Sequence, residues 1–321
     1  MIENSLLIGN GLNRTLENQS NSWSDLLKGF AKTRQLKSNE NIPMPLEFER
    51  LMNLHMSKKC LKNKTEAYGR AKRSIANTIK KTSIANDSTA IHHKLKLIKI
   101  NNILTTNYDG LIEEAYGLNN ISSICEKSKT CLLKPTNNIN DVKFYHLHGL
   151  VTKPSTMCLG QVHYSKIVKI LQEDLDNKKG CVRKTNSNLK ILRILRNEEK
   201  SDSWGSLFFT SNIGIVGFSL YDCEIDIWWL LAKRAALYFQ DYGGAKSLIK
   251  NKIVFYDVFC KSEEHEEQNQ KLRKYELLKG LRVSVVKVII DEKKDYERAY
   301  ELILKELKEN GISDKTKEYI I

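Results

Sequence analysis

Side chains that hydrogen-bond strongly gather in the segment Thr105–Asp109, which reads TTNYD. An apolar pair, Ile103-Leu104, precedes it, and an amphipathic stretch over residues 110–116 follows it. We therefore predict a strand that ends in this segment and a helix that begins there, with Asp109 as its N-cap. Open α/β sheets bind ligands at the carboxyl ends of their strands, so the amide of Asn107 is placed to bind a carboxamide, a ribose hydroxyl or a water. A turn that tolerates asparagine would explain Asn107 without any ligand.

Two histidines end the next predicted strand, in the sequence FYHLHG from Phe144 to Gly149. Histidine titrates near neutral pH, so His148 can act as a general base. His146 has the same strand parity and is expected to point to the same side. The pair could bind a metal, but no third ligand is evident, and we predict no metal site. We favour His148 as functional and His146 as structural, although a lone histidine is more often structural.

Glycines follow the first predicted strand, Leu6–Ile8, in the turn Gly9-Asn10-Gly11. Such a turn lets backbone amides approach a pyrophosphate, which the start of a following helix also favours. The third glycine of a GxGxxG turn is missing, because position 14 is Arg14. A plain strand-to-helix turn would account for the same residues.

A similar turn, Gly217-Phe218-Ser219, follows the predicted strand Ile213–Val216. A glycine and a hydroxyl at a strand end suit contact with ribose or phosphate. The turn is no nucleophile elbow, since GxSxG requires a glycine where Tyr221 stands. A βα turn with Ser219 or Asp222 as the helix cap is the alternative.

Strands and helices alternate along most of the chain. Besides the strands above, the pattern predicts strands at 142–147, 253–256 and 283–290, and helices at 25–30 (capped by Ser24), 45–81, 90–99, 225–237 and 296–307. This alternation predicts an α/β fold with a Rossmann-like, doubly wound parallel sheet. We treat residues 1–321 as a single domain with helical insertions at about 30–100 and 150–205.

Composition limits the classes of protein to consider. The 321 residues are 41% hydrophobic and include only 4 prolines, as in a folded globular protein. No run approaches the ~18 apolar residues of a membrane span, and the N-terminus does not resemble a signal peptide. Seven single cysteines without a CxxC pair suit a reducing compartment. We therefore expect a cytoplasmic protein without membrane or zinc. Its net charge of +14 suits acidic partners or nucleic acid.

Taken in order, GNGLN, TTNYD, HLHG and GFS resemble the signature of the sirtuin family. The sirtuin order is a glycine-rich turn, a TQN-[IV]-D segment, a catalytic HG and a G-[ST]-S segment. The spelling here looks most like the sirtuin-like (SIR2-like) NAD hydrolases of bacterial anti-phage defence. The two CxxC pairs of deacylase sirtuins are absent, since the HG to GFS interval holds only Cys158 and Cys181. The proline- and arginine-rich cofactor loop of sirtuins is also missing.

This resemblance implies an NAD+ hydrolase that releases nicotinamide and ADP-ribose, with NAD as substrate and no zinc. It implies catalytic roles for Asn107 and His148. The expected NAD-binding residues are Gly9, Asn10, Gly11, Asn13, Thr106, Asp109, Gly217 and Ser219. A protein deacylase and a non-catalytic binder of NAD, ADP-ribose or nucleic acid are the alternatives.

The resemblance further implies a regulated effector that depletes cellular NAD+ in abortive infection. Such proteins assemble as homo-oligomers or with a separately encoded sensor, a HerA-type ATPase or an Argonaute-type subunit, through which nucleic acid would be sensed. The chain has no P-loop GxxxxGK[ST] of its own. We therefore expect the sensor to be another subunit or one of the helical insertions.

Overall fold

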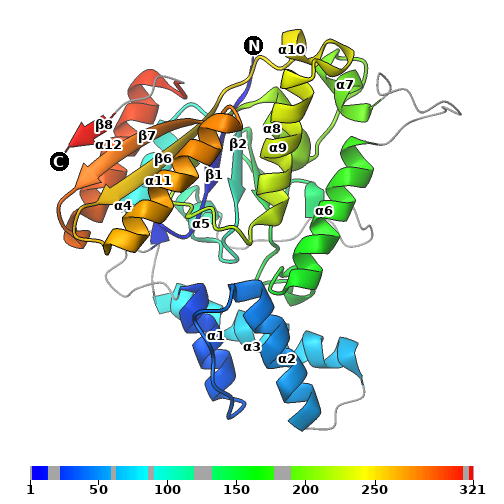
Figure 1. The fold of residues 1–321 in the computed structure, drawn as a ribbon, viewed down its shortest axis with the longest axis vertical. Coiled ribbons are helices and arrows are strands. Elements are labelled where there is room, and N and C mark those ends of the chain that lie inside the picture. Colours follow the sequence, from blue (N-terminus) through cyan, green and yellow to red (C-terminus); the bar gives the residue numbers. More distant parts are fainter. Residues whose placement is uncertain are drawn as a thin grey trace, which may run out of the picture.

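The computed structural model describes residues 2–13, 22–58, 63–85, 90–118, 132–176, 189–313 and 318–320. These residues form one eight-stranded sheet with the strand order β3-β4-β2-β1-β5-β6-β7-β8. All neighbouring strands are parallel except β3, which runs antiparallel to β4. Helices lie on both faces of the sheet (Figure 1). The predicted doubly wound α/β fold is confirmed.

The described strands and helices have the following bounds. The strands are β1 (Asn4–Ile8), β2 (Asn102–Thr105), β3 (Asn137–Ile139), β4 (Val142–His146), β5 (Asn212–Val216), β6 (Ile253–Cys260), β7 (Ser284–Ile290) and β8 (Glu318–Ile320). The α-helices are α1 (Trp23–Lys32), α2 (Met44–Lys58), α3 (Lys64–Ala85), α4 (Ala90–Lys94), α5 (Leu111–Ala115), α6 (Gln161–Leu175), α7 (Lys190–Leu195), α8 (Trp204–Thr210), α9 (Ile225–Phe239), α10 (Ala245–Leu248), α11 (His265–Gly280) and α12 (Tyr296–Asn310).

Alternate residues of each central strand enter different hydrophobic clusters. Leu7 of β1 packs with apolar side chains of α6 to α11. Leu6 and Ile8, its neighbours, pack on the other face with α4, α5 and α12. Because side chains of a strand alternate between faces, both faces of the sheet are buried, as in parallel sheets generally. Each fully buried leucine of this kind contributes about 1.5–3 kcal/mol to stability.

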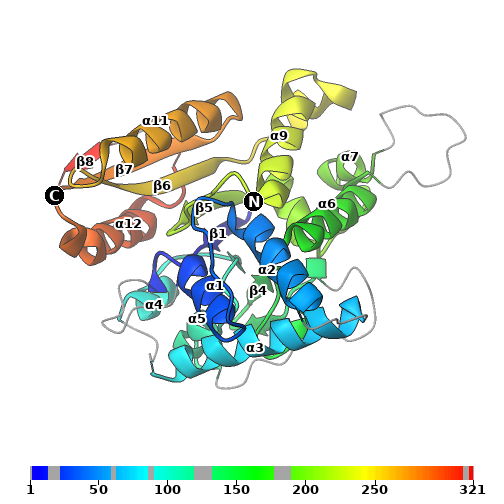
Figure 2. The same cartoon turned by 60° about the horizontal axis from the view of Figure 1, so that its bottom comes forward.

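A third hydrophobic cluster joins α1, α2 and α3 to the loops of the sheet. It contains Phe48 and Met52 of α2 together with Tyr108, which follows β2, and Met157, which lies beyond β4. Figure 1 shows the three helices as a separate group below the sheet, and Figure 2 turns this group toward the viewer. Helices α1, α2 and α3 thus lie beyond the strand ends that precede the predicted site residues, whereas α4 packs on a face of the sheet. The helices within 150–205 (α6, α7 and α8) instead pack on one face of the sheet.

The chain reverses its direction of travel across the sheet at β1. It passes from β1 to β2 and β4 on one side, and then returns to β5 on the other side of β1. This reversal is the topological switch point at which open α/β sheets bind their ligands. The glycine turns after β1 and β5 therefore meet where a ligand site is expected.

Several predicted helix starts are wrong. Ser22, and not Ser24, caps α1, because its side chain and that of Asp25 form a reciprocal capping box. The helix after TTNYD begins one residue later than predicted, with Gly110 as N-cap.

Three further boundaries also differ. Glu224 is the N-cap of α9, in place of the predicted Ser219 or Asp222. The helix expected at 90–99 ends at Lys94 and continues as a 3₁₀ turn, η2 (Leu95–Leu97). The segment expected at 45–81 is two helices, α2 and α3. No helix among the described residues is long and apolar enough to cross a membrane.

Candidate active site

The turns after β1 and β5 are in close backbone contact. The amide of Gly9 donates to the carbonyl of Val216 (3.0 Å), and that of Gly11 donates to the carbonyl of Gly217 (2.7 Å). A Cβ at Gly9 would stand 2.5 Å from the Gly217 carbonyl oxygen, and Gly217 has a φ of +62°. This contact requires glycine at both positions. Mutual packing of the two turns at the switch point therefore explains these glycines.

Asn13 and Asp109 join the turn after β1 to the segment after β2. The amide Nδ2 of the buried Asn13 donates to Asp109 Oδ2 at 3.0 Å, while its Oδ1 lies 2.9 Å from His92 Nε2. The Asp109 carboxylate also accepts from the Leu111 amide at 3.3 Å. Burial raises the pKa of Asp109 to about 6. The structure thus brings together two of the predicted NAD-binding residues, and Asp109 also supports the first turn of α5.

Asn107 is held by its backbone, which leaves its amide directed at the first glycine turn. Its N–H donates to Thr105 Oγ1 (3.0 Å), and its carbonyl accepts from His146 Nδ1 (2.9 Å). The side-chain Nδ2 lies 3.5 Å from the Gly9 carbonyl oxygen. Since that contact is long, the side-chain amide can take another hydrogen-bond partner while the backbone hydrogen bonds of Asn107 keep the loop in place.

His146 is a buried link between the strand ends and α5. Its Nδ1 donates to the Asn107 carbonyl, and its Nε2 lies 2.6 Å from Glu113 Oε1. Burial opposes the charged imidazole, but the Glu113 carboxylate and the Asn107 carbonyl outweigh it and raise the pKa of His146. Both ring nitrogens are engaged, so the geometry agrees with the structural role predicted for this residue.

His148 lies two residues beyond the end of β4 and contacts a different helix. Its Nε2 donates to Asp226 Oδ2 of α9 at 2.9 Å and lies 3.7 Å from Glu224 Oε2. Its ring packs edge-on against Tyr164 of α6, with centroids 5.0 Å apart. The expectation that both histidines point to the same side is wrong, because the strand ends at His146 and the chain then turns.

The charges around His148 are unbalanced. One imidazole, 2% exposed, faces the two buried carboxyls Glu224 and Asp226, which are 6% and 0% exposed. Burial opposes the charged imidazole, but the carboxylates outweigh it and raise its pKa. Burial and the Asp226 charge raise the pKa of Glu224 to about 7, against the opposing effect of His148. Both carboxyls therefore cannot easily be ionised together.

A chain of contacts connects this group to the TTNYD segment. The hydroxyl of Tyr108 donates to the Cys158 carbonyl at 2.5 Å, and the Cys158 amide donates to the His148 carbonyl at 2.8 Å. Three other predicted residues are less closely involved. Ser219 is exposed and its carbonyl accepts from Lys274, whereas Asn10 and Thr106 are half-buried.

Glu224 and Asp226 are the residues that sequence reasoning missed. With His148 they form a group of three potential metal ligands whose donor atoms lie within 4.8 Å of one another, and the only such group found among the described residues. The predicted absence of a metal site stays a prediction. A signal for Asp226 was present, since it stands one helical turn before Leu230 on the buried face of α9.

Cysteines give no zinc site in the described part of the chain. Cys158, Cys223 and Cys260 are free thiols there. Cys60, Cys125, Cys131 and Cys181 lie outside the described residues, as does most of the segment that replaces the sirtuin cofactor loop.

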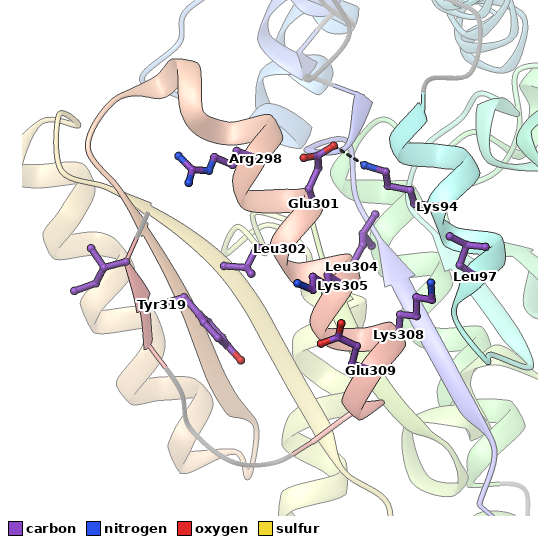
Figure 3. Close-up of a pocket in the computed structure, with 11 residues that line it drawn as sticks. Lys94, Leu97, Arg298, Glu301, Leu302, Leu304, Lys305, Lys308, Glu309 and Tyr319 are labelled. Atoms are coloured by element: carbon purple, nitrogen blue, oxygen red, sulfur yellow. Dashed lines mark hydrogen bonds and ion pairs between the residues drawn. The ribbon is translucent and has the colours of Figure 1, made fainter.

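A cleft of about 770 Å³ lies elsewhere, between α12, the α4–η2 segment and β8 (Figure 3). Lys94 and Glu301 pair across it at 2.5 Å, and Arg298 and Lys305 also line it. None of the predicted site residues does. Its volume alone therefore gives no reason to move the site away from the switch point.

Comparison with known proteins finds a similarity to a family model that covers part of the chain. Residues 101–240 match the family model described as a SIR2-like domain. The match includes TTNYD, both histidines, the GFS turn and the whole of α9. A search of curated proteins found no match.

Proposed function

We propose that this chain is an NAD+ glycohydrolase, and the match of residues 101–240 to the SIR2-like domain model supports the proposal. NAD+ and water would give nicotinamide, ADP-ribose and a proton. The bond from the nicotinamide nitrogen to the ribose C1′ would break, and a water oxygen would bond to C1′. The observation that carries the proposal is the pair Asn107 and His148, which follow the neighbouring strands β2 and β4.

The residues present fit a dinucleotide at the switch point. The two glycine turns lie together beside the expected pyrophosphate position, although the Gly9 and Gly11 amides already donate to the carbonyls of Val216 and Gly217. Asn107 Nδ2, with its long contact to Gly9, can turn to a ribose hydroxyl, a carboxamide or the attacking water. Asp226 Oδ1 is buried and has no hydrogen-bond partner among the described residues. A polar ligand would satisfy such an atom.

His148 would remove a proton from the water or from a ribose hydroxyl. Glycosyl transfer passes through an oxocarbenium-like state that carries positive charge. The Asp226 carboxylate beside His148 supplies a local negative charge that favours such a state. General base catalysis of this kind accounts for about 10²–10⁴ in rate.

We further propose that the activity is regulated, as an effector of anti-phage defence. The support is the family resemblance, together with the basic charge of +14, which suits an acidic or nucleic-acid-bound partner. The activity would reside in the cytoplasm, alone or as an oligomer with a sensor subunit. Purified protein would then show low turnover that rises when the partner is added.

Product analysis tests the assignment. The purified chain is incubated with NAD+, with and without an acetylated peptide, and products are separated by chromatography. We expect equal amounts of nicotinamide and ADP-ribose without the peptide. Asn107→Ala should lower the rate by about 100-fold or more, whereas Asn138→Ala, at an exposed asparagine of β3, should not. Products that form only with the peptide would instead support a deacylase. Binding of NAD+ without turnover, even with the partner present, would support a non-catalytic binder.

A further inference from the structure

We propose that Asp226 is a positioning residue for His148: its carboxylate fixes the imidazole with the proton on Nε2 and leaves Nδ1 as the basic atom. The effect on catalysis rests on the proposed function, whereas the hydrogen bond and the tautomer of His148 do not. Asp226 belongs to the first turn of α9, and His148 follows β4, 78 residues earlier in the chain. Only the fold brings the two together.

The geometry indicates that His148 and Asp226 form a specific hydrogen-bonded pair, which we call the dyad. Nε2 of His148 and Oδ2 of Asp226 are 2.9 Å apart, and the two side chains are 2% and 0% exposed. Because an ionised carboxylate only accepts hydrogen bonds, Nε2 carries the proton. No described residue hydrogen-bonds Nδ1. A carboxylate that holds one histidine nitrogen sets the tautomer and raises the basicity of the other nitrogen, as in catalytic triads.

Most of the other titratable groups near the ring are neutral. Tyr164 of α6, Tyr108 after β2 and the thiols of Cys158 and Cys223 stay neutral, since burial raises the pKa of all four. Lys72 of α3 has a pKa lowered by burial to about 8, and its ammonium contacts the Ser155 carbonyl. Glu224, 3.7 Å from Nε2, is the second acid. Asp226 is therefore the carboxylate with the hydrogen bond.

The first test is a spectrum that needs no turnover. In ¹⁵N-labelled protein, long-range ¹H–¹⁵N correlations report the protonation and tautomer of each of the seven histidines, and His148→Gln identifies the His148 signals. We expect neutral His148 to carry its proton on Nε2, with a pKa above the ordinary value. Asp226→Asn should lower that pKa and mix the tautomers. An unchanged pKa and tautomer in Asp226→Asn would overturn the proposal.

The second test is the pH profile of NAD+ cleavage. A base must be neutral, so kcat should rise with pH through the pKa of His148. Asp226→Asn should move this rise to lower pH and reduce the plateau of kcat by about 100-fold, with KM changed far less. Asp226→Glu should recover part of the loss, and Asp222→Asn, an exposed acid in the same loop, should match the unaltered protein.

Two outcomes separate this inference from the proposed function. If the chain does not cleave NAD+ at all, the proposed function fails while the spectrum still decides whether the dyad exists. If the purified protein instead holds one equivalent of Zn²⁺ that Asp226→Asn releases, the three side chains are metal ligands, and the dyad is wrong.

Discussion

Two histidines that are two residues apart, equally buried and each beside carboxyl groups, have different surroundings in this molecule. At His146, one imidazole meets one carboxylate, Glu113, and the second ring nitrogen meets a backbone carbonyl. At His148, one imidazole meets two carboxyls, and only Nε2 has a hydrogen-bond partner among the described residues. We call the first the balanced site, because each ring nitrogen has one hydrogen-bond partner. The second has an excess of acid and one nitrogen available for a ligand.

The comparison indicates which of the two histidines stabilises the fold and which is free to bind a ligand. A buried ion pair such as His146 and Glu113 holds two segments together, because removal of either partner leaves a buried charge. Buried groups of like charge shift each other's pKa values, and residues with shifted pKa values are concentrated at functional sites. We therefore expect His146, which ends β4, to stabilise the fold, and His148 to act in the proposed site.

The largest effect on stability is expected at the balanced site. His146→Ala leaves Glu113 buried without its cation and frees the Asn107 carbonyl, so the free energy of unfolding should fall by about 3–5 kcal/mol. Because the folded pKa of His146 is raised, its stabilisation is complete below the ordinary pKa of 6.5 and is lost as pH rises through the folded pKa. Urea unfolding at several pH values measures this. His93→Ala, at an exposed histidine of α4, is the control. A loss that grows with pH would contradict the ion pair.

A smaller effect, of opposite sign, is expected at the acid-rich site. The pKa of Glu224 is about 7 in the folded protein and 4.5 ordinarily, so the folded state loses stability as pH rises between these values. Glu224→Gln should therefore be more stable than the unaltered protein at pH ~8, by up to about 3 kcal/mol, and nearly equal to it at pH ~4.5. Thermal unfolding at the two pH values measures the difference.

Glu113→Gln is the matched control for that experiment. It makes the same chemical change at the balanced site, where it removes a charge-assisted hydrogen bond and should destabilise by about 1.5–3 kcal/mol. If both variants shift stability in the same direction, the contrast between the two histidine sites is wrong.

Much of the framework could be predicted, because strand and helix periods are local. In Leu6–Ile8 and Ile213–Val216, successive apolar side chains enter two different hydrophobic clusters, and this apolar pattern is visible in the sequence. Asn107 and His148 could be singled out because each stands in a recognisable segment after a strand. Asp226 could not be paired with His148, since nothing local places α9 beside the end of β4. Of the acids in this segment, the sequence pattern singles out only Asp222, as a helix cap, which is the commoner role of acids at a helix start.

The most direct test of the central claim is the rate of nicotinamide release from NAD+ by the purified chain, with its partner where one is needed, compared with His148→Ala and His93→Ala. Circular dichroism confirms that each variant is folded, and His148→Gln replaces His148→Ala if the smaller side chain loosens the fold. We predict that loss of His148 lowers the rate by about 100-fold or more, while His93→Ala retains it. Equal rates in the folded His148 and His93 variants would contradict the account.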